Sequence, residues 1–169
     1  MTEKSSEGSQ SLTNDTLRKV VVIGIGNKYR SDDGIGLFVA QQIHKKYFSF
    51  ITIKEESGEG AALMEAWQGF HDVMIVDAVS SGAKPGTIFR IDAHKDIVPI
   101  KFFHTSTHAF SVAEAIEVAR AMNILPPRLL VYGIEGANFS AGVTLSLGVQ
   151  ESGKQVVEQI LSEIRDEDR

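Results

Sequence analysis

Carboxylate and imidazole side chains stand close to the ends of three apolar runs in this sequence. Asp33 follows a β-branched run and a Gly-Ile-Gly-Asn turn, Asp77 interrupts a second apolar run, and His108 precedes an amphipathic segment. Two carboxylates and an imidazole suit nickel, zinc, manganese or iron(II), and three protein ligands leave positions open for water or substrate. An open site implies chemistry or recognition. We therefore predict a metal-binding site built from these three residues.

Asp32 and Asp33 are adjacent at the start of a predicted helix, where free N–H groups and the helix dipole favour carboxylates. Capping explains one of them. It does not explain both, because adjacent residues point in different directions on a helix. The glycines before them do not form a dinucleotide-binding motif, since G-x-G-x-x-G requires glycine where this chain has Tyr29.

Asp77 has two interpretations. A carboxylate within an apolar strand is costly to bury unless it is paired, hydrogen-bonded or metal-bound. It can cap the turn at 80–82, or it can belong to a functional site, and the sequence leaves both open. Glu135 likewise either contacts the site or accepts hydrogen bonds from turn amides, and we favour the second role.

His104 and His108 are four residues apart, but the Glu of the H-E-x-x-H motif is missing and the segment is a predicted loop. A zincin-type site is therefore not expected. His108 remains a candidate metal ligand or general base, and the simpler interpretation is a polar surface residue.

Strand-like and helix-like patterns alternate along the chain. This order predicts an α/β fold, a three-layer sandwich with a mostly parallel twisted sheet of about five strands and helices on both faces. In such sheets the functional crevice lies outside the carboxyl ends of the strands. The predicted strands are Val20–Ile25, Phe48–Ile53, Asp72–Val79, Thr87–Ile91 and Arg128–Ile134, and the predicted helices are Ile35–Tyr47, Gly60–Trp67, Ser111–Ala121 and Val149–Ile164.

The composition limits the functional classes. The chain has 169 residues, a net charge of −5 and no cysteine, which excludes disulfides, thiolate nucleophiles and cysteine-ligated metals. The acidic balance argues against nucleic-acid binding, and no apolar run is long enough for a membrane span. We expect a flexible polar leader at 1–18, a single α/β domain at 19–165, and a cytoplasmic location.

Four segments, in this order, resemble the hydrogenase maturation endopeptidases: VVVIGIGNKYRSDDGIGLFVAQQI, IVDAVSSGAKPGTIFRI, STHAFSVAEAIEVA and VYGIEGANFSAGVTLS. The resemblance covers almost the whole chain beyond the leader. It implies an endopeptidase that trims the C-terminal extension from the large-subunit precursor of a NiFe hydrogenase. It also implies that Asp33, Asp77 and His108 form the metal-binding and catalytic trio, with nickel supplied by the substrate.

This resemblance and the residue chemistry favour one mechanism. The chain has no cysteine and no G-x-S-x-G motif, so a covalent acyl-enzyme is disfavoured. We expect a metal-dependent peptidase of aspartic or metallo type, with a metal-polarised carbonyl or metal-bound water. Asn27 and Asp32 are candidates for contacts to substrate or to the primary site residues. The alternative is a non-catalytic maturation factor that checks nickel in the large subunit without cutting it.

Overall fold

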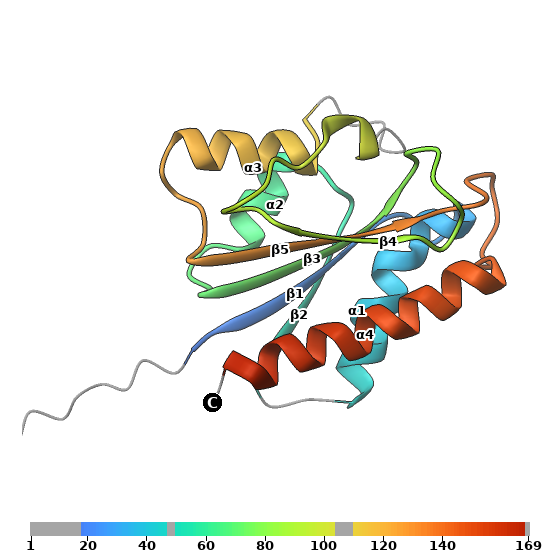
Figure 1. Cartoon of the computed structure of the whole chain (residues 1–169), viewed down its shortest axis with the longest axis horizontal. Coiled ribbons are helices and arrows are strands. Elements are labelled where there is room, and N and C mark those ends of the chain that lie inside the picture. The colour runs from blue at the N-terminus through green and yellow to red at the C-terminus, as the bar shows by residue number, and fades with distance from the viewer. Residues whose placement is uncertain (1–17, 47–49, 104–109, 168–169) are drawn as a thin grey trace, which may run out of the picture.

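Strands and helices follow one another in the predicted order (Figure 1). The computed structural model describes residues 18–46, 50–103 and 110–167. The strands are β1 (Val20–Ile25), β2 (Ile51–Glu56), β3 (Asp72–Val79), β4 (Ile88–Asp92) and β5 (Arg128–Glu135). The helices are α1 (Ile35–Lys46), α2 (Gly60–Ala66), α3 (Val112–Ala121) and α4 (Leu147–Glu167), with short 3-10 turns η1 (Ser31–Gly34) and η2 (Ile100–Phe103).

In the described part of the chain, five strands form one sheet in the order β2-β1-β3-β5-β4. All neighbouring pairs are parallel except β4, which runs antiparallel to β5 at one edge. The central strands β1 and β3 are buried along their whole length, as expected for parallel strands covered on both faces. The predicted three-layer α/β fold is confirmed.

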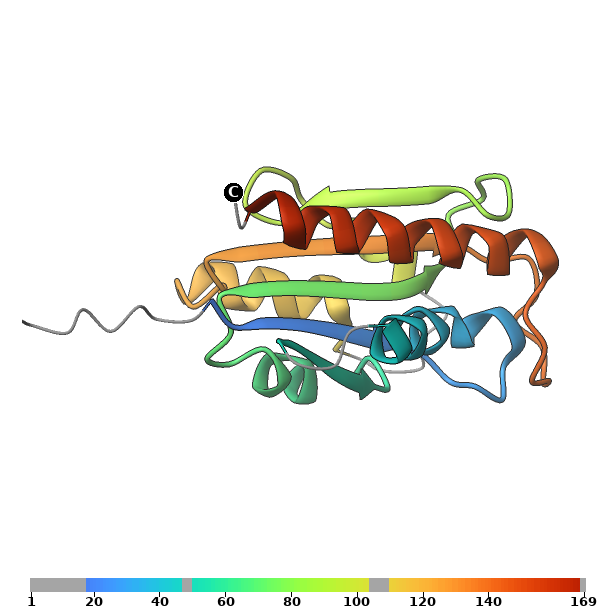
Figure 2. The same cartoon turned by 90° about the horizontal axis from the view of Figure 1, so that it is seen from below.

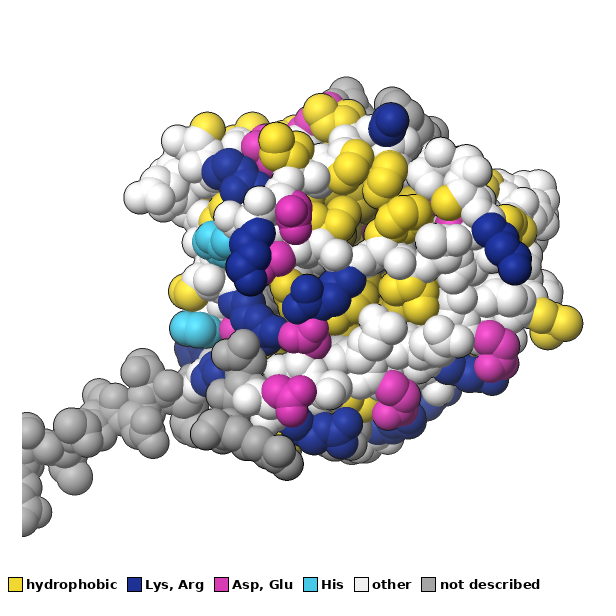
Figure 3. Space-filling model, viewed as in Figure 1, with side chains coloured by type: hydrophobic (Ala, Val, Ile, Leu, Met, Phe, Trp, Pro, Cys, Tyr) yellow, Lys and Arg dark blue, Asp and Glu magenta, His cyan; other side chains and the backbone are white. Residues whose placement is uncertain are grey.

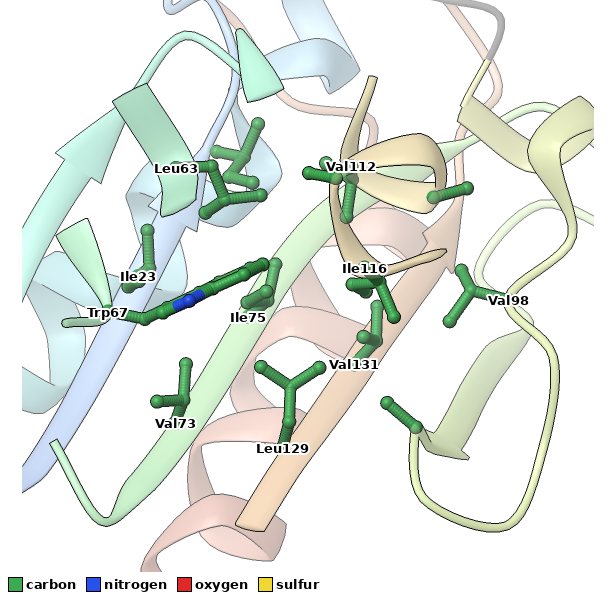
Figure 4. Packing of buried hydrophobic residues seen from close by; sticks show 14 of the residues in the cluster. Ile23, Leu63, Trp67, Val73, Ile75, Val98, Val112, Ile116, Leu129 and Val131 are labelled. Carbon is green, nitrogen blue, oxygen red and sulfur yellow. The ribbon is translucent and has the colours of Figure 1, made fainter. Parts of the chain in front are cut away.

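Helices cover both faces of the sheet (Figure 2). Alternate residues of β3 divide between them: Val73 and Ile75 pack with α2 and α3, whereas Met74 and Val76 pack with α1 and α4. On the first face Trp67 lies between the sheet and the helices (Figure 4). No helix within the described ranges is both long enough and apolar enough to cross a membrane.

Several element boundaries differ from the prediction by one residue, and the larger differences lie at β2 and α4. β2 runs over Ile51–Glu56 rather than Phe48–Ile53, because at the sheet edge its polar second half lies half-exposed beside β1. α4 runs over Leu147–Glu167, past both predicted ends. Arg18, which we placed in the leader, forms an ion pair with Asp72, so the domain contacts begin one residue earlier than predicted. The rest of the proposed leader lies outside the described residues.

A capping box formed by Ser111 and Glu114 starts α3. The Ser111 N–H donates to the Glu114 carboxylate at 2.6 Å. This reciprocal contact satisfies N–H groups that an α-helix leaves free at its first turn. It fixes where α3 begins, directly after the segment that carries His108.

Glu163 ties α4 to the outer strands of the sheet. The Arg90 Nε–H donates to Glu163 Oε1 at 2.6 Å, and Arg128 pairs with the other carboxylate oxygen. Burial alone would raise the pKa of Glu163. The Arg90 hydrogen bond and the charges of both arginines outweigh it and lower the pKa below the ordinary 4.5.

This lowered pKa makes the ion pair's contribution depend on pH. A carboxylate with a lower pKa in the folded state stabilises the fold above its unfolded pKa and loses that contribution as the pH falls. We expect Glu163→Gln to lower the free energy of unfolding by about 1 kcal/mol at pH 7 and far less at pH 3. Urea unfolding at both pH values measures this, with Glu158→Gln, an exposed partner of Lys46, as the weaker control. An equal loss at both pH values would contradict the assignment.

Candidate functional site

The sheet changes its direction of growth between β1 and β3. The chain adds β2 on one side of β1 and then returns to add β3 on the other side. In open α/β sheets, the carboxyl end of such a switch point is where the loops separate and a ligand crevice forms. Asp33 follows β1 and Asp77 lies near the end of β3, so both candidates flank this point.

A close contact between α1 and the sheet positions Asp33. A Cβ built on Gly36 would lie 2.3 Å from the carbonyl oxygens of both Ile25 and Val76. Only glycine lets the first turn of α1 pack this closely on β1 and β3. The preceding turn η1 is thereby held at the carboxyl ends of both strands. There, the Asn27 N–H donates to Asp33 Oδ2 at 3.0 Å.

Asp77 lies on the face of β3 that points toward α2 and α3, in the same row as Val73 and Ile75. It is only 5% exposed. Burial raises the pKa of Asp77 well above its ordinary 3.8, the negative charge of Asp33 raises it further, and the Ala78 N–H opposes this shift. Two buried carboxylates that repel one another gain most from a shared cation.

The turn at 80–82 does not use Asp77 as its cap. Within the described residues, the Ser81 and Gly82 N–H groups and the Ser81 hydroxyl donate to Glu135, at 2.6 to 3.1 Å. The Ser80 N–H donates to the Phe102 carbonyl. The capping interpretation of Asp77 is therefore wrong. Glu135 instead makes the turn-amide contacts that we considered for it.

The donor chemistry of the Asp33–Asp77 pair fits a divalent cation. Carboxylate oxygens alone suit hard cations such as manganese, and an imidazole beside them extends the choice to nickel, zinc or iron(II). In the part of the chain that the structure describes, no three His, Asp or Glu side chains are grouped to hold a metal. The third predicted ligand, His108, lies outside the described residues. The described neighbours of its segment, Phe103 and Phe110, both pack on the α2 and α3 face, to which Asp77 also points.

Asp32 is fully buried and does not cap its own helix. Its carboxylate accepts the N–H groups of Ala137, Asn138 and Ser146 and the Ser146 hydroxyl, at 2.7 to 2.9 Å. These bonds fasten the loop after β5 to the η1 turn that carries Asp33. Capping, which we considered for one of the two adjacent aspartates, therefore does not apply to Asp32, because the loop amides use its oxygens. Asp32 therefore positions the loop after β5 beside the turn that carries Asp33.

We expect Asp32→Ala to leave three loop N–H groups without their acceptor and to lower the free energy of unfolding by about 3 kcal/mol. Asp32→Asn keeps one carboxamide oxygen as acceptor and should cost less. Thermal unfolding measures the order wild type, Asn, Ala. An Ala variant as stable as the wild type would show that the loop does not depend on this anchor.

Asn27 shapes the turn after β1. Its side chain accepts the Tyr29 N–H at 2.9 Å, while Asn27 itself is exposed.

Two further residues, Ser146 and Gly133, were not predicted to belong to the site. Ser146 lies 114 residues from its partner Asp32, a pairing that no local pattern reveals. Gly133 pairs with Asp77 across the sheet, and a Cβ there would lie 2.8 Å from Val79 Cγ1. The absence of a side chain at Gly133 therefore lets Val79 and Phe89 pack into the row beside Asp77.

A doubly wound α/β domain with paired carboxylates at its switch point is the class of protein that the fold and the site define. The family model for hydrogenase maturation protease (HycI) matches residues 39–163, a range that includes Asp77 and begins after Asp33. The chain therefore belongs to the hydrogenase maturation protease family, a family of peptidases.

Curated relatives agree with this assignment. The chain is 23% identical over 152 residues to the hydrogenase 2 maturation protease of Escherichia coli, covering 88% of this chain and 92% of that protein. It is 32% identical over 123 residues to the hydrogenase expression/formation protein HupD of Rhizobium leguminosarum, covering 69% of this chain and 59% of HupD.

Solved structures share the fold. The hydrogenase maturating endopeptidase HybD of Escherichia coli superimposes with a TM-score of 0.73 at 20% identity, covering 88% of this chain and 93% of HybD. The maturation protease HycI of Thermococcus kodakarensis superimposes with a TM-score of 0.65 at 20% identity, covering 86% of this chain and 92% of HycI.

Proposed function

We propose that this protein is an endopeptidase that removes the C-terminal extension of a NiFe-hydrogenase large-subunit precursor after nickel insertion. The observation that carries the proposal is the pair of buried, mutually repelling carboxylates, Asp33 and Asp77, at the switch point of the sheet. Membership of the maturation protease family supports a peptidase activity. The precursor, its nickel and the extension are the substrate in this proposal.

The nickel of the precursor is the recognition element. Asp33 and Asp77 present oxygens to it, and His108 is the third ligand or the general base. When the metal is present, it polarises the scissile carbonyl or lowers the pKa of an attacking water. The two carboxylates hold the peptide's metal-bearing region against the carboxyl ends of β1 and β3, while Asp32 keeps the loop after β5 in place above them.

The chain also supplies the means of excluding a precursor that lacks nickel. Without a cation, burial makes a negative charge at Asp77 unfavourable, and the nearby charge of Asp33 adds to this effect. A divalent cation offsets both the cost of burying the charge and the repulsion between the two carboxylates. Binding of the cleavage region is therefore favoured only when the metal accompanies it, which is the discrimination that a maturation protease needs.

The experiment is incubation of the protein with the precursor in its nickel-loaded and nickel-free forms, followed by intact-mass measurement of the precursor. We expect the C-terminal extension to be lost from the nickel-loaded form alone. Binding of the loaded precursor without loss of mass would replace the proposal with a non-catalytic nickel-checking factor. Cleavage of both forms at equal rates would overturn the role of nickel.

The role of His108, the third proposed site residue, is tested by a variant of its own. We expect His108→Ala to reduce the processing rate to the level of the uncatalysed reaction while the melting temperature stays within a few degrees of the wild type. His104→Ala, four residues earlier in the same segment, is the matched control and should retain processing. Equal activity of both variants would remove His108 from the site.

A further inference from the structure

Strand β4 forms one edge of the sheet, and its outer side carries unpaired backbone groups. Ala93 donates to Leu129 and Thr87 accepts from Glu135 across the β4–β5 pair. Because hydrogen-bonding direction alternates along a strand, Phe89 and Ile91 also face β5, whereas Ile88 and Arg90 face outward. Within the described sheet, β4 is an edge strand whose only neighbour is β5, so no strand lies beside the outward N–H and C=O groups of Ile88 and Arg90.

Apolar side chains flank this open edge on one side. Figure 3 looks onto β4 and shows hydrophobic side chains gathered over the strand and toward η2. Phe89 and Ile91 are half-buried there, and Phe102 of η2 packs against Phe89 with ring centroids 4.9 Å apart. Ile97 and Ile100, in the segment from β4 to η2, are 77% and 51% exposed. An extended chain added to β4 would therefore place alternate side chains against an apolar surface.

The open edge of β4 lies in the same row across the sheet as Asp77 of the candidate site. Asp77 pairs with Gly133, and Gly133 pairs with Phe89, so these three residues form one row across the sheet. With about 4.8 Å between strands, Phe89 is about 10 Å from Asp77 and an added strand would be about 14 Å from it. At about 3.3 Å per extended residue, roughly four residues connect the two positions.

We propose that the open edge of β4 binds the C-terminal extension of the precursor as an added antiparallel or parallel strand. This inference rests on the proposed function, because the occupant is the segment which that function removes. An unpaired row of N–H and C=O groups is complementary to an extended backbone and to little else. The extension fits because it is released by cleavage and must approach the site as a segment free of the folded large subunit.

The first test uses a substitution that removes one outward donor. Proline is tolerated on an edge strand where its nitrogen faces away from the neighbouring strand. We expect the KM of Arg90→Pro for the nickel-loaded precursor to be about tenfold higher than that of Arg90→Ala, with the same kcat. Both variants lose the ion pair to Glu163, but only Arg90→Pro also loses the backbone N–H. Equal KM values for the two variants, with processing intact, would overturn the proposed strand addition but would not contradict the peptidase activity.

The second test does not depend on the stability of the proline variant. Hydrogen exchange, resolved by residue with NMR, compares the free Asp77→Asn variant with the same variant saturated by nickel-loaded precursor. We expect the Ile88 and Arg90 amides to exchange rapidly in the free protein and at least tenfold more slowly in the complex. Phe89 and Ile91, already bonded to β5, serve as internal references. Unchanged exchange at Ile88 and Arg90 in the complex overturns the inference, and absence of processing by the wild type overturns both it and the proposed function.

Discussion

Asp77→Asn strongly slows processing and makes the metal-free protein more stable. The carboxamide has nearly the same shape and still accepts the Ala78 N–H, but it carries no charge beside Asp33. We expect the processing rate to fall by about 10²- to 10³-fold, as when one group that stabilises transition-state charge is removed. We expect the free energy of unfolding at pH 7 to rise by about 1 kcal/mol.

The pH dependence identifies the cause of this gain. Because the pKa of Asp77 is higher in the folded state than in the unfolded state, the wild type loses stability as the pH rises from the ordinary 3.8 toward the folded value. Asp77→Asn has no such loss. The two proteins should therefore unfold at the same urea concentration near pH 3 and diverge toward neutral pH. A variant that is less stable at pH 7 would show that Asp77 is a structural carboxylate.

Gly36→Ala and Asp32→Ala are the two substitutions with the largest expected effects on stability. Alanine at an ordinary helical position is more favourable than glycine, but here its Cβ would lie 2.3 Å from two carbonyl oxygens of the central strands. Neither backbone can move without disturbing the sheet, so we expect a loss of about 3 kcal/mol. Displacement of α1 also moves η1, and Asp33 with it, so processing should fall in the fraction that remains folded.

Gly148→Ala is the matched control for this prediction. Gly148 lies in the first turn of α4 and has no atom within 4 Å of the added Cβ. We expect this variant to gain about 0.5 kcal/mol and to process the precursor at the wild-type rate. Thermal unfolding of both variants gives the comparison. Equal melting temperatures would contradict the close packing of α1 on β1 and β3.

The fold could be predicted from the sequence because the patterns that indicate its strands and helices are local. The buried runs that form β1 and β3 are apolar and rich in β-branched residues, with Asp77 interrupting the second, and the bounds of both strands match the prediction. The capping box of α3 lies within four residues. β2 was misplaced because its polar second half, which includes Lys54, is compatible with an edge strand but does not distinguish it from a loop.

The site was accessible in part. We predicted that Asp33 and Asp77 lie close together, because the carboxyl ends of parallel strands share one edge of the sheet. The structure places their charges close enough to interact. The turn-amide role that we favoured for Glu135 is confirmed. The role of Asp32 was missed, because it depends on partners 105 to 114 residues away, at Ala137 and Ser146. Such contacts depend on tertiary packing, which no short motif encodes. The prediction for His108 remains open to experiment.

The central claim is that the Asp33–Asp77 pair carries the processing of a nickel-loaded precursor. The most direct measurement is the intact mass of that precursor after incubation with wild type, Asp33→Asn, Asp77→Asn and Gly148→Ala, each shown to be folded by its melting temperature. We expect loss of the C-terminal extension with wild type and Gly148→Ala, and an unchanged mass with both aspartate variants. Processing by either aspartate variant at the wild-type rate would contradict the claim.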